Sequence, residues 1–128
     1  MKYLLDTHAL IWFMRGDEML SEKAKKIILI DFQNCYVSLA SFWEMSIKSS
    51  LNKLDLGLPF IEAENWALEN GLSNFLKVEM EHINKLSQLP FHHRDPFDRT
   101  LIAQALTENL SIITKEKLFE EYGVTRIW

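Results

Sequence analysis

The sequence contains few of the features that mark secreted, disordered or membrane-spanning chains. Among its 128 residues are one cysteine, three prolines and four glycines, and no apolar run approaches the length of a membrane span. A single thiol cannot form an internal disulfide, and so few prolines and glycines argue against long linkers. Asp6 interrupts the first apolar run, where a signal peptide would continue it. We therefore expect a cytoplasmic protein with no membrane segment.

The chain also lacks an excess of positive charge. It has 14 basic and 18 acidic residues and a net charge of −4, which by itself argues against a nucleic-acid partner. If five of the 18 acids form one metal-binding cluster, the other 13 nearly balance the 14 bases. Net charge therefore does not decide what kind of partner the protein has.

What the chain does contain is enough apolar material for one core. Hydrophobic residues make up 48% of the sequence, and its length is close to the usual size of one domain. We expect a single domain over residues 1–128. Cys35 lies within an apolar run, so we expect a buried and unreactive thiol.

Short apolar runs alternate with segments of helical periodicity along the chain. Strands are predicted at residues 3–5, 35–39, 76–78, 111–114 and 124–128. Helices are predicted at residues 9–15, 21–31, 41–52, 59–71 and 80–89, followed by a helix that begins at Asp95 and a helical turn at 118–122. Such alternation is typical of a mainly parallel sheet with right-handed crossovers. The predicted fold class is α/β, a three-layer α/β/α sandwich.

Five carboxylates lie where a strand ends or a helix begins: Asp6, Glu44, Asp95, Asp98 and Glu116. An open parallel sheet gathers the carboxyl ends of its strands along one edge. These acids can therefore converge although they are far apart in sequence.

Taken singly, the acids have ordinary structural explanations. Asp6 can cap the first helix, and Asp95 and Asp98 both suit the first turn of a later one. Glu44 lies among large apolar neighbours, where a carboxylate is costly, but it can pair with Lys48 one turn later. No single acid is specific for a function.

Taken together, the acids indicate a cation. Two like charges about 4 Å apart repel by roughly 4 kcal/mol at an effective dielectric constant near 20, a large part of a small domain's stability. An all-oxygen site suits Mg²⁺ or Mn²⁺, and the chain has no Cys and His spacing of the kind that binds zinc. One or two such ions can promote in-line hydrolysis of a phosphodiester. The residues thus favour a metal-dependent nuclease.

Several stretches resemble the PIN-domain ribonucleases, particularly the VapC-like toxins of bacterial toxin–antitoxin pairs. The matching segments are Leu4–Trp12, Val37–Lys48, His93–Ala105 and Ile112–Trp128. The resemblance extends from end to end of the chain, and the acidic motif around Asp95 and Asp98 is its specific part.

This resemblance implies an α/β/α fold and a metal-dependent endoribonuclease that cuts single-stranded or structured RNA. Asp6 and Glu44 match the first two metal-binding acids, and Asp95 or Asp98 matches the third. One or two Mg²⁺ or Mn²⁺ ions, a homodimer and a cognate antitoxin are implied as well. Glu116 departs from the pattern, because such proteins usually have an Asp there; it is a fifth candidate ligand or an acid of a surface turn.

Basic residues near the acids are candidates for binding the substrate. The substrate-binding candidates are Arg94, Arg99, Lys48 and Thr7, with Lys53 as a further cation. Ion pairs on helix surfaces are the alternative for the charged ones. Three histidines near these positions, His8, His92 and His93, are expected to be structural or surface residues.

Aromatic residues have two interpretations. We expect Trp12, Trp43 and Trp66 to pack in the core, although tryptophans can also stack on the bases of single-stranded RNA. Phe42 and Trp43 can alternatively form part of a dimer or antitoxin interface.

Two other functions are compatible with the sequence. The first is a non-catalytic PIN-like module that binds RNA or protein. The second is an aspartate-based phosphoryl-transfer domain with Asp6 as nucleophile. The second is weakened because Thr7 and His8 follow Asp6, so the usual second acid of such phosphatases is missing.

Overall fold

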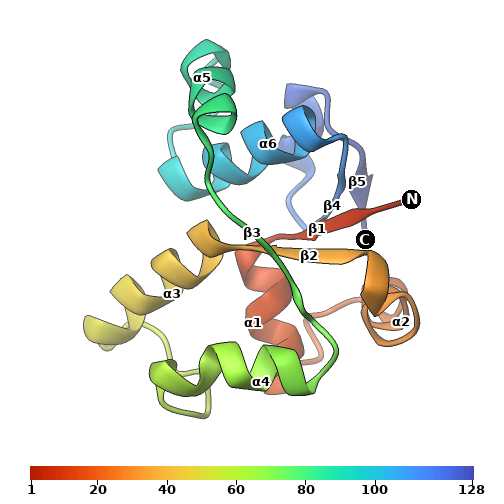
Figure 1. Cartoon of the computed structure of the whole chain (residues 1–128), viewed down its shortest axis with the longest axis vertical. Coiled ribbons are helices and arrows are strands. Elements are labelled where there is room, and N and C mark those ends of the chain that lie inside the picture. Colours follow the sequence, from red (N-terminus) through yellow and green to blue (C-terminus); the bar gives the residue numbers. More distant parts are fainter.

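The computed structural model describes all 128 residues, and its centre is a sheet of five parallel strands. The strands are β1 (Tyr3–Leu5), β2 (Cys35–Ser38), β3 (Asn74–Leu76), β4 (Ser111–Ile113) and β5 (Arg126–Ile127). They lie in the order β3-β2-β1-β4-β5 (Figure 1). The chain first adds β2 and β3 on one side of β1 and then crosses over to add β4 on the other. That reversal is the switch point at which open α/β folds place their ligand sites.

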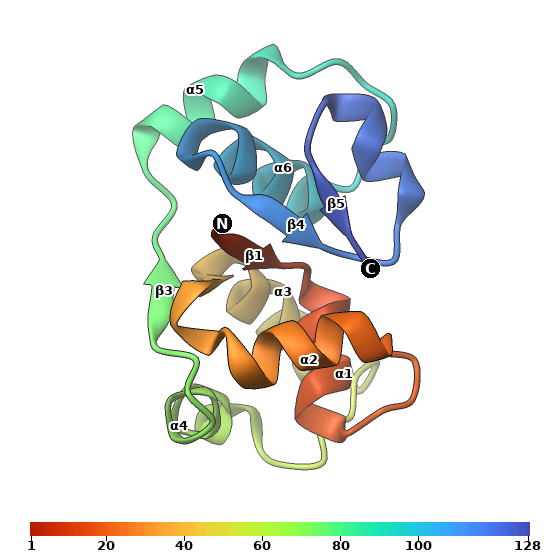
Figure 2. The same ribbon diagram turned by 90° about the vertical axis from the view of Figure 1, so that its right-hand side faces the viewer.

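Helices cover both faces of the sheet, as Figure 2 shows. They are α1 (Thr7–Arg15), α2 (Glu22–Ile30), α3 (Leu39–Ser50), α4 (Ala63–Glu69), α5 (Met80–Gln88) and α6 (Pro96–Glu108). Short 3-10 turns occur at Phe32–Asn34, Phe60–Glu62 and Lys117–Tyr122. Helices α5 and α6 lie on one side of the sheet and α1, α2 and α4 on the other. The predicted α/β/α sandwich is confirmed. None of the helices is both long and apolar enough to cross a membrane.

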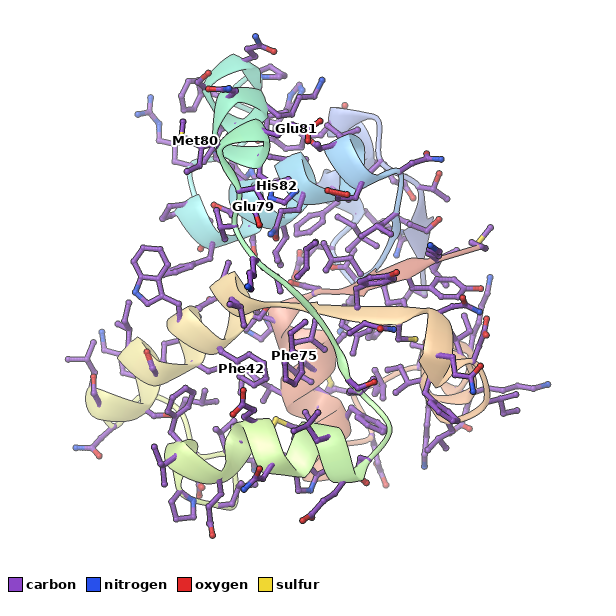
Figure 3. All side chains as sticks on the ribbon, in the orientation of Figure 1. Phe42, Phe75, Glu79, Met80, Glu81 and His82 are labelled. Atoms are coloured by element: carbon purple, nitrogen blue, oxygen red, sulfur yellow. The ribbon has the colours of Figure 1, made fainter.

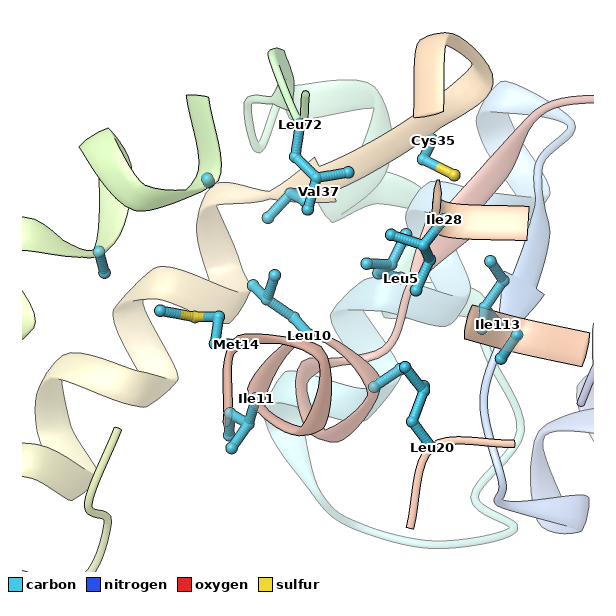
Figure 4. Close-up of a cluster of buried hydrophobic side chains, with 14 of the residues drawn as sticks. Leu5, Leu10, Ile11, Met14, Leu20, Ile28, Cys35, Val37, Leu72 and Ile113 are labelled. Atoms are coloured by element: carbon cyan, nitrogen blue, oxygen red, sulfur yellow. The ribbon is translucent and has the colours of Figure 1, made fainter. Parts of the chain in front are cut away.

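Each face of the sheet packs into its own apolar core. Leu5 and Ile113 are fully buried in the core that contains Leu10 of α1 (Figure 4). Leu4 and Ile112, the residues immediately before them, belong to the opposite core beneath α6. Successive side chains of a strand point to opposite faces, so a strand covered on both faces is apolar at every position. This is why β1 is an uninterrupted apolar run in the sequence and why Ile112 and Ile113 follow each other in β4.

The buried thiol expected at Cys35 is confirmed. The side chain is inaccessible to solvent and belongs to the core shown in Figure 4. Burial first, and then the nearby charge of Asp31, raise the pKa of the thiol to about 12. Cys35 therefore stays neutral and is not a nucleophile.

Strand β3 begins two residues earlier than predicted, at Asn74 rather than at residue 76. The side-chain amide of Asn74 donates a hydrogen bond to the Cys35 carbonyl oxygen at 3.3 Å. Phe75 packs edge-on against Phe42, with the ring centres 5.5 Å apart (Figure 3). Val78, predicted to end this strand, is instead 38% exposed. Contacts with distant residues, rather than local apolarity, decide where β3 lies.

Other boundaries also differ from the predictions. Helix α3 begins at Leu39 rather than at residue 41, because the Ser38 hydroxyl accepts the backbone N–H of Ala40 and caps the helix. The helix predicted for residues 59–71 is divided into a 3-10 turn and the shorter α4. The last strand has two residues instead of five. The helix predicted for residues 80–89 is confirmed as α5, and the Glu79 N–H donates to His82 Nδ1 at its start (Figure 3).

The core makes a direct prediction for stability. Leu10→Ala should lower the free energy of unfolding by about 2–5 kcal/mol, because it removes a fully buried side chain and leaves a cavity. Leu51→Ala, the same substitution at a side chain that is 57% exposed, should change it by less than about 0.5 kcal/mol. Urea denaturation measures both. Equal losses in the two variants would contradict this description of the core.

Candidate active site

Asp6 lies at the switch point, directly after β1. It occupies the cap position of α1, yet its carboxylate makes no capping hydrogen bond. Asp6 Oδ2 instead accepts the hydroxyl proton of Thr114, the residue that follows β4, at 2.8 Å. The side chain is 2% exposed, and Oδ1 has no hydrogen-bond partner. The capping explanation therefore does not account for Asp6, and a buried carboxylate oxygen is left without a partner.

Glu44 reaches the same region from α3. The helix is tied to the start of α1, because the Thr7 hydroxyl donates to the Ser41 hydroxyl at 2.9 Å. Glu44 is 3% exposed, and its Oε2 accepts a hydrogen bond from Lys48 Nζ at 2.6 Å. The salt bridge expected as an alternative is thus present. It uses only one oxygen, and the buried Oε1 has no partner.

Asp95 and Asp98 begin α6 and behave differently from each other. The Asp95 carboxylate caps the helix by accepting the N–H of Asp98 at 2.8 Å, and Pro96 occupies the first turn. Asp95 is exposed. The Asp98 side chain is 22% exposed and accepts no hydrogen bond. The structure therefore favours Asp98 over Asp95 as the third acid of the site.

The electrostatics of Asp98 show that the acids converge. Burial first, and then the charges of Asp6, Asp95, Glu44 and Glu116, raise its pKa to about 8. All four residues that act on it are acids singled out in the sequence. The carboxyl ends of the strands have thus brought together residues separated by more than 100 positions in the chain.

Asp6 is also shifted, and for a related reason. Burial raises its pKa to about 6, while the hydrogen bond from Thr114 and the proximity of His8 act in the opposite direction. The charge of Glu44 contributes a further increase. At neutral pH the metal-free site therefore holds Asp98 mainly protonated and Asp6 mainly ionised, because burial disfavours a full set of charged carboxylates.

Glu116 belongs to the margin of the cluster. Its N–H donates to the Thr114 hydroxyl oxygen at 3.0 Å, and this hydroxyl in turn donates to Asp6. The Glu116 side chain is exposed. Thr114 thus connects the backbone of Glu116 to the central carboxylate, while the Glu116 carboxylate itself is at the surface.

These donors fit a divalent cation that prefers oxygen. Asp6 and Glu44 each offer a buried oxygen without a partner, and Asp98 offers a partly buried carboxylate. No group of three acidic, His or Cys side chains is yet close enough to coordinate one ion. Lys48 Nζ neutralises part of the charge at Glu44. Ion binding therefore requires side-chain movement around a fixed backbone.

Comparison with known sequences decides the family. Residues 3–124 match the sequence model of the PIN domain. The chain belongs to the PIN domain family. Toxins of this family are generally nucleases. No curated protein matches the sequence.

Several solved structures share this PIN fold. VapBC2 from Rickettsia felis, bound to a DNA fragment from its promoter, has a chain with a TM-score of 0.70 and 13% identity, covering 99% of this chain and 98% of that one. DNA-bound VapBC from Salmonella typhimurium has a chain with a TM-score of 0.73 and 14% identity, and the match covers 99% of this chain and 97% of that one. FitAcB from Neisseria gonorrhoeae has a chain with a TM-score of 0.67 and 16% identity, and the match covers 98% of this chain and 96% of that one. Identities this low demonstrate a common fold.

The structure gives two of the expected substrate-binding residues of this PIN domain other roles. Arg99 is 5% exposed, and its guanidinium donates to the carbonyl oxygens of Pro90, at 2.7 Å, and Leu89, at 3.3 Å. Thr7 is 1% exposed, and its hydroxyl donates to Ser41. Both side chains hold the backbone around the site and are not exposed to a substrate. Arg94 and Lys48 are accessible.

Trp43 is also placed differently from the expectation. It is 63% exposed and contacts Phe97 edge-on, with ring centres 5.2 Å apart. The prediction that Trp43 packs in the core is wrong. Trp12 and Trp66 are partly buried and pack against the first core.

His93 is a residue of the site that sequence reasoning treated as ordinary. Its Nδ1 lies 2.7 Å from the Tyr122 hydroxyl, which already accepts the backbone N–H groups of His92 and His93. We therefore assign the Tyr122 hydroxyl as donor and His93 Nδ1 as acceptor, so that the single ring proton of a neutral His93 is on Nε2. Nε2 is buried and lies 3.6 Å from Asp98 Oδ2, too far for a hydrogen bond. Burial lowers the pKa of His93. No local sequence signal links His93 to Tyr122, 29 residues away.

The raised pKa of Asp98 predicts how the stability of the metal-free protein varies with pH. The carboxyl titrates near 3.8 in the unfolded chain and near 8 in the folded one. Between these values unfolding releases a proton, so stability falls as pH rises, by up to about 1.4 kcal/mol per pH unit for one group. In EDTA, Asp98→Asn should reduce this decline and be more stable than wild type at pH 8. Urea titrations from pH 5 to pH 8 test this, with the exposed Glu69→Gln as control. Parallel curves for wild type and Asp98→Asn would contradict it.

Proposed function

We propose that the chain is a Mg²⁺- or Mn²⁺-dependent endoribonuclease and the toxin of a toxin–antitoxin pair. The convergence of Asp6, Glu44 and Asp98 at the switch point of the sheet supports this proposal most directly. Asp6 and Glu44 each have a buried oxygen that no group of the chain contacts, and a cation accounts for both. Membership of the PIN domain family supports hydrolysis of nucleic acid over other uses of a divalent cation.

The residues divide the chemistry among them. A bound divalent cation supplies an activated water and neutralises charge on the phosphate. Asp6, Glu44 and Asp98 would hold it. Asp95 and Glu116 lie at the margin of the site and would add negative charge near the cation. Lys48 donates a hydrogen bond to the buried Glu44. Burial lowers the pKa of Lys48, but this hydrogen bond and the charges of Glu44, Asp95 and Asp98 together outweigh burial, and the pKa is raised. His93 faces Asp98 and limits its rotation.

The proposed partners are RNA, an antitoxin and a second copy of the chain. The VapBC and FitAcB assemblies with the same fold support an antitoxin. Exposed apolar side chains on and beside α3 and α5 support a homodimer. They line a hollow of about 540 Å³ and include Leu39, Trp43, Val78 and Ile83. Aromatic and aliphatic side chains gathered in a hollow are typical of the buried centre of a protein–protein interface.

A non-catalytic PIN module is the second candidate. It is favoured by the absence of a preformed three-ligand group and by Glu116 in place of the usual Asp. The aspartate-based phosphoryl-transfer alternative has less support, because the Asp6 carboxylate is buried and hydrogen-bonded to Thr114. Measurement of RNA cleavage separates the two principal candidates.

Purified protein, freed from its antitoxin, should cut single-stranded RNA when Mg²⁺ or Mn²⁺ is present and not in EDTA. Asp6→Asn should reduce the cleavage rate at least about 100-fold, since removal of one strong electrostatic contact to the reaction typically has this effect. Circular dichroism should show an unchanged fold. Glu116→Gln should reduce the rate less, because this side chain is exposed at the margin. Intact RNA across diverse substrates and both metals would support the non-catalytic module.

Metal binding can be measured independently of cleavage. Mg²⁺ at a hundred times its Kd should stabilise the wild type by about 2.7 kcal/mol, which raises the Tm by several degrees. The increase should be much smaller in Asp98→Asn. Glu81→Gln removes an exposed acid of α5 and should respond like wild type. An identical Mg²⁺ response in all three proteins would exclude Asp98 as a ligand.

A further inference from the structure

Two hollows adjoin the acids, and they share a pair of aromatic side chains. The first, called here the Lys53 hollow, has a volume of about 400 Å³ and is lined by Arg15, Lys48 and Lys53. The second, the Lys117 hollow, has a volume of about 520 Å³ and is lined by Lys115 and Lys117. His8 and Trp12 line both. Their rings are 5.7 Å apart and form a ridge between the two hollows.

Lys48 pairs with Glu44, and Arg15 donates to the Asp55 carbonyl oxygen, but the other cations of these hollows have no acidic partner. No ion pair of the structure includes Arg15, Lys53, Lys115 or Lys117. Two acids, Asp17 and Asp55, also line the Lys53 hollow. Each accepts a backbone N–H within its own loop, at 2.9 Å from Met19 and 2.8 Å from Gly57. These acids shape the turns, and the basic side chains are left for an anion from outside.

Both hollows are continuous with the acidic site. Lys48 lines the Lys53 hollow and donates to Glu44. Glu116 lines the Lys117 hollow and is one of the acids that raise the pKa of Asp98. His8, on the ridge, follows Asp6 by two residues and acts on its charge. An anionic polymer lying in both hollows would therefore contact Glu116 and Lys48, which adjoin the proposed metal-binding acids.

We propose that a single-stranded RNA crosses the His8–Trp12 ridge and lies in both hollows. Phosphates on the two sides of the cleaved bond bind Lys53 and Lys117, and one base stacks on the exposed His8 ring and its neighbour Trp12. This proposal rests on the proposed nuclease function and adds the residues that hold the flanking nucleotides. Aromatic stacking with backbone cations on either side is how single strands are held without dependence on sequence. A duplex, whose bases are already stacked, cannot use the ridge in this way.

The test compares charge removal at the hollows with the same change elsewhere. All variants are made in the Asp6→Asn background, which is expected to bind RNA in Mg²⁺ without cutting it. The double variant Lys53→Ala, Lys117→Ala should bind a fluorescein-labelled single-stranded RNA about tenfold more weakly at low salt. The slope of log affinity against log salt should fall by about 1.4, since each phosphate contact to a single strand contributes about 0.7. Fluorescence anisotropy measures both.

A matched control and an aromatic variant complete the experiment. Lys25→Ala, Lys26→Ala removes two lysines from a hollow on α2 that contains none of the five acids, and it should bind like the background. His8→Ala should weaken binding at least fivefold at pH 8 without changing the salt slope, because it removes stacking rather than charge. Thermal melting verifies that each variant is folded.

The possible failures can be told apart. If wild type cuts RNA but the Lys53, Lys117 variant keeps the affinity and salt slope of the background, the inference is overturned and the proposed function stands. The hollows would then be a surface for a protein partner. If wild type cuts no RNA with either metal, the proposed function fails, and the inference of an RNA strand positioned for cleavage is overturned with it.

Discussion

The candidate site depends on one unfavourable condition, the burial of carboxylates beside one another at the switch point of the sheet. Asp6 is fixed there by the strand order, because β1 and β4 are neighbours and Thr114 at the end of β4 donates to its carboxylate. Glu44 and Asp98 arrive on α3 and α6 from either side of the switch. Burial first, and then the charges of neighbouring acids, raise the pKa values of Asp6 and Asp98. A free carboxylate cluster of this kind stores the energy that a cation releases on binding.

Residues around the acids hold the backbone and side chains of this site in place. Arg99, buried among the carbonyl oxygens of the segment that leads into α6, orders the backbone before Asp95. Tyr122 binds both Arg99 and His93, so the 3-10 turn after β4 is joined to the start of α6. Lys48 restrains Glu44. Because these contacts fix the backbone and leave acid oxygens unpartnered, ion binding needs only side chains to move.

Strands with both faces buried could be predicted from the sequence, since β1 and the Ile112–Ile113 part of β4 are short runs of consecutive apolar residues. The acids could also be predicted as a group, because strand ends of a parallel sheet share an edge. The start of β3 could not, since it depends on the contact of Phe75 with Phe42. Nor could the roles of Arg99 and His93, whose partners are backbone carbonyls and a distant Tyr122. The prediction for Trp43 was wrong because an exposed apolar residue on a helix has the same sequence pattern as one that packs in the core.

Net charge misleads for this chain because its charges are segregated. The value of −4 is an average over a buried acidic site and a surrounding surface with unpaired lysines and arginines. Under the proposed function, a divalent cation would neutralise the acids, and the nearby field would then be dominated by Lys53, Lys115, Lys117 and Arg15. The same cation would therefore have two effects, relieving repulsion within the fold and reversing the sign of the surface that the substrate approaches. Stability and substrate attraction should depend on the same ion.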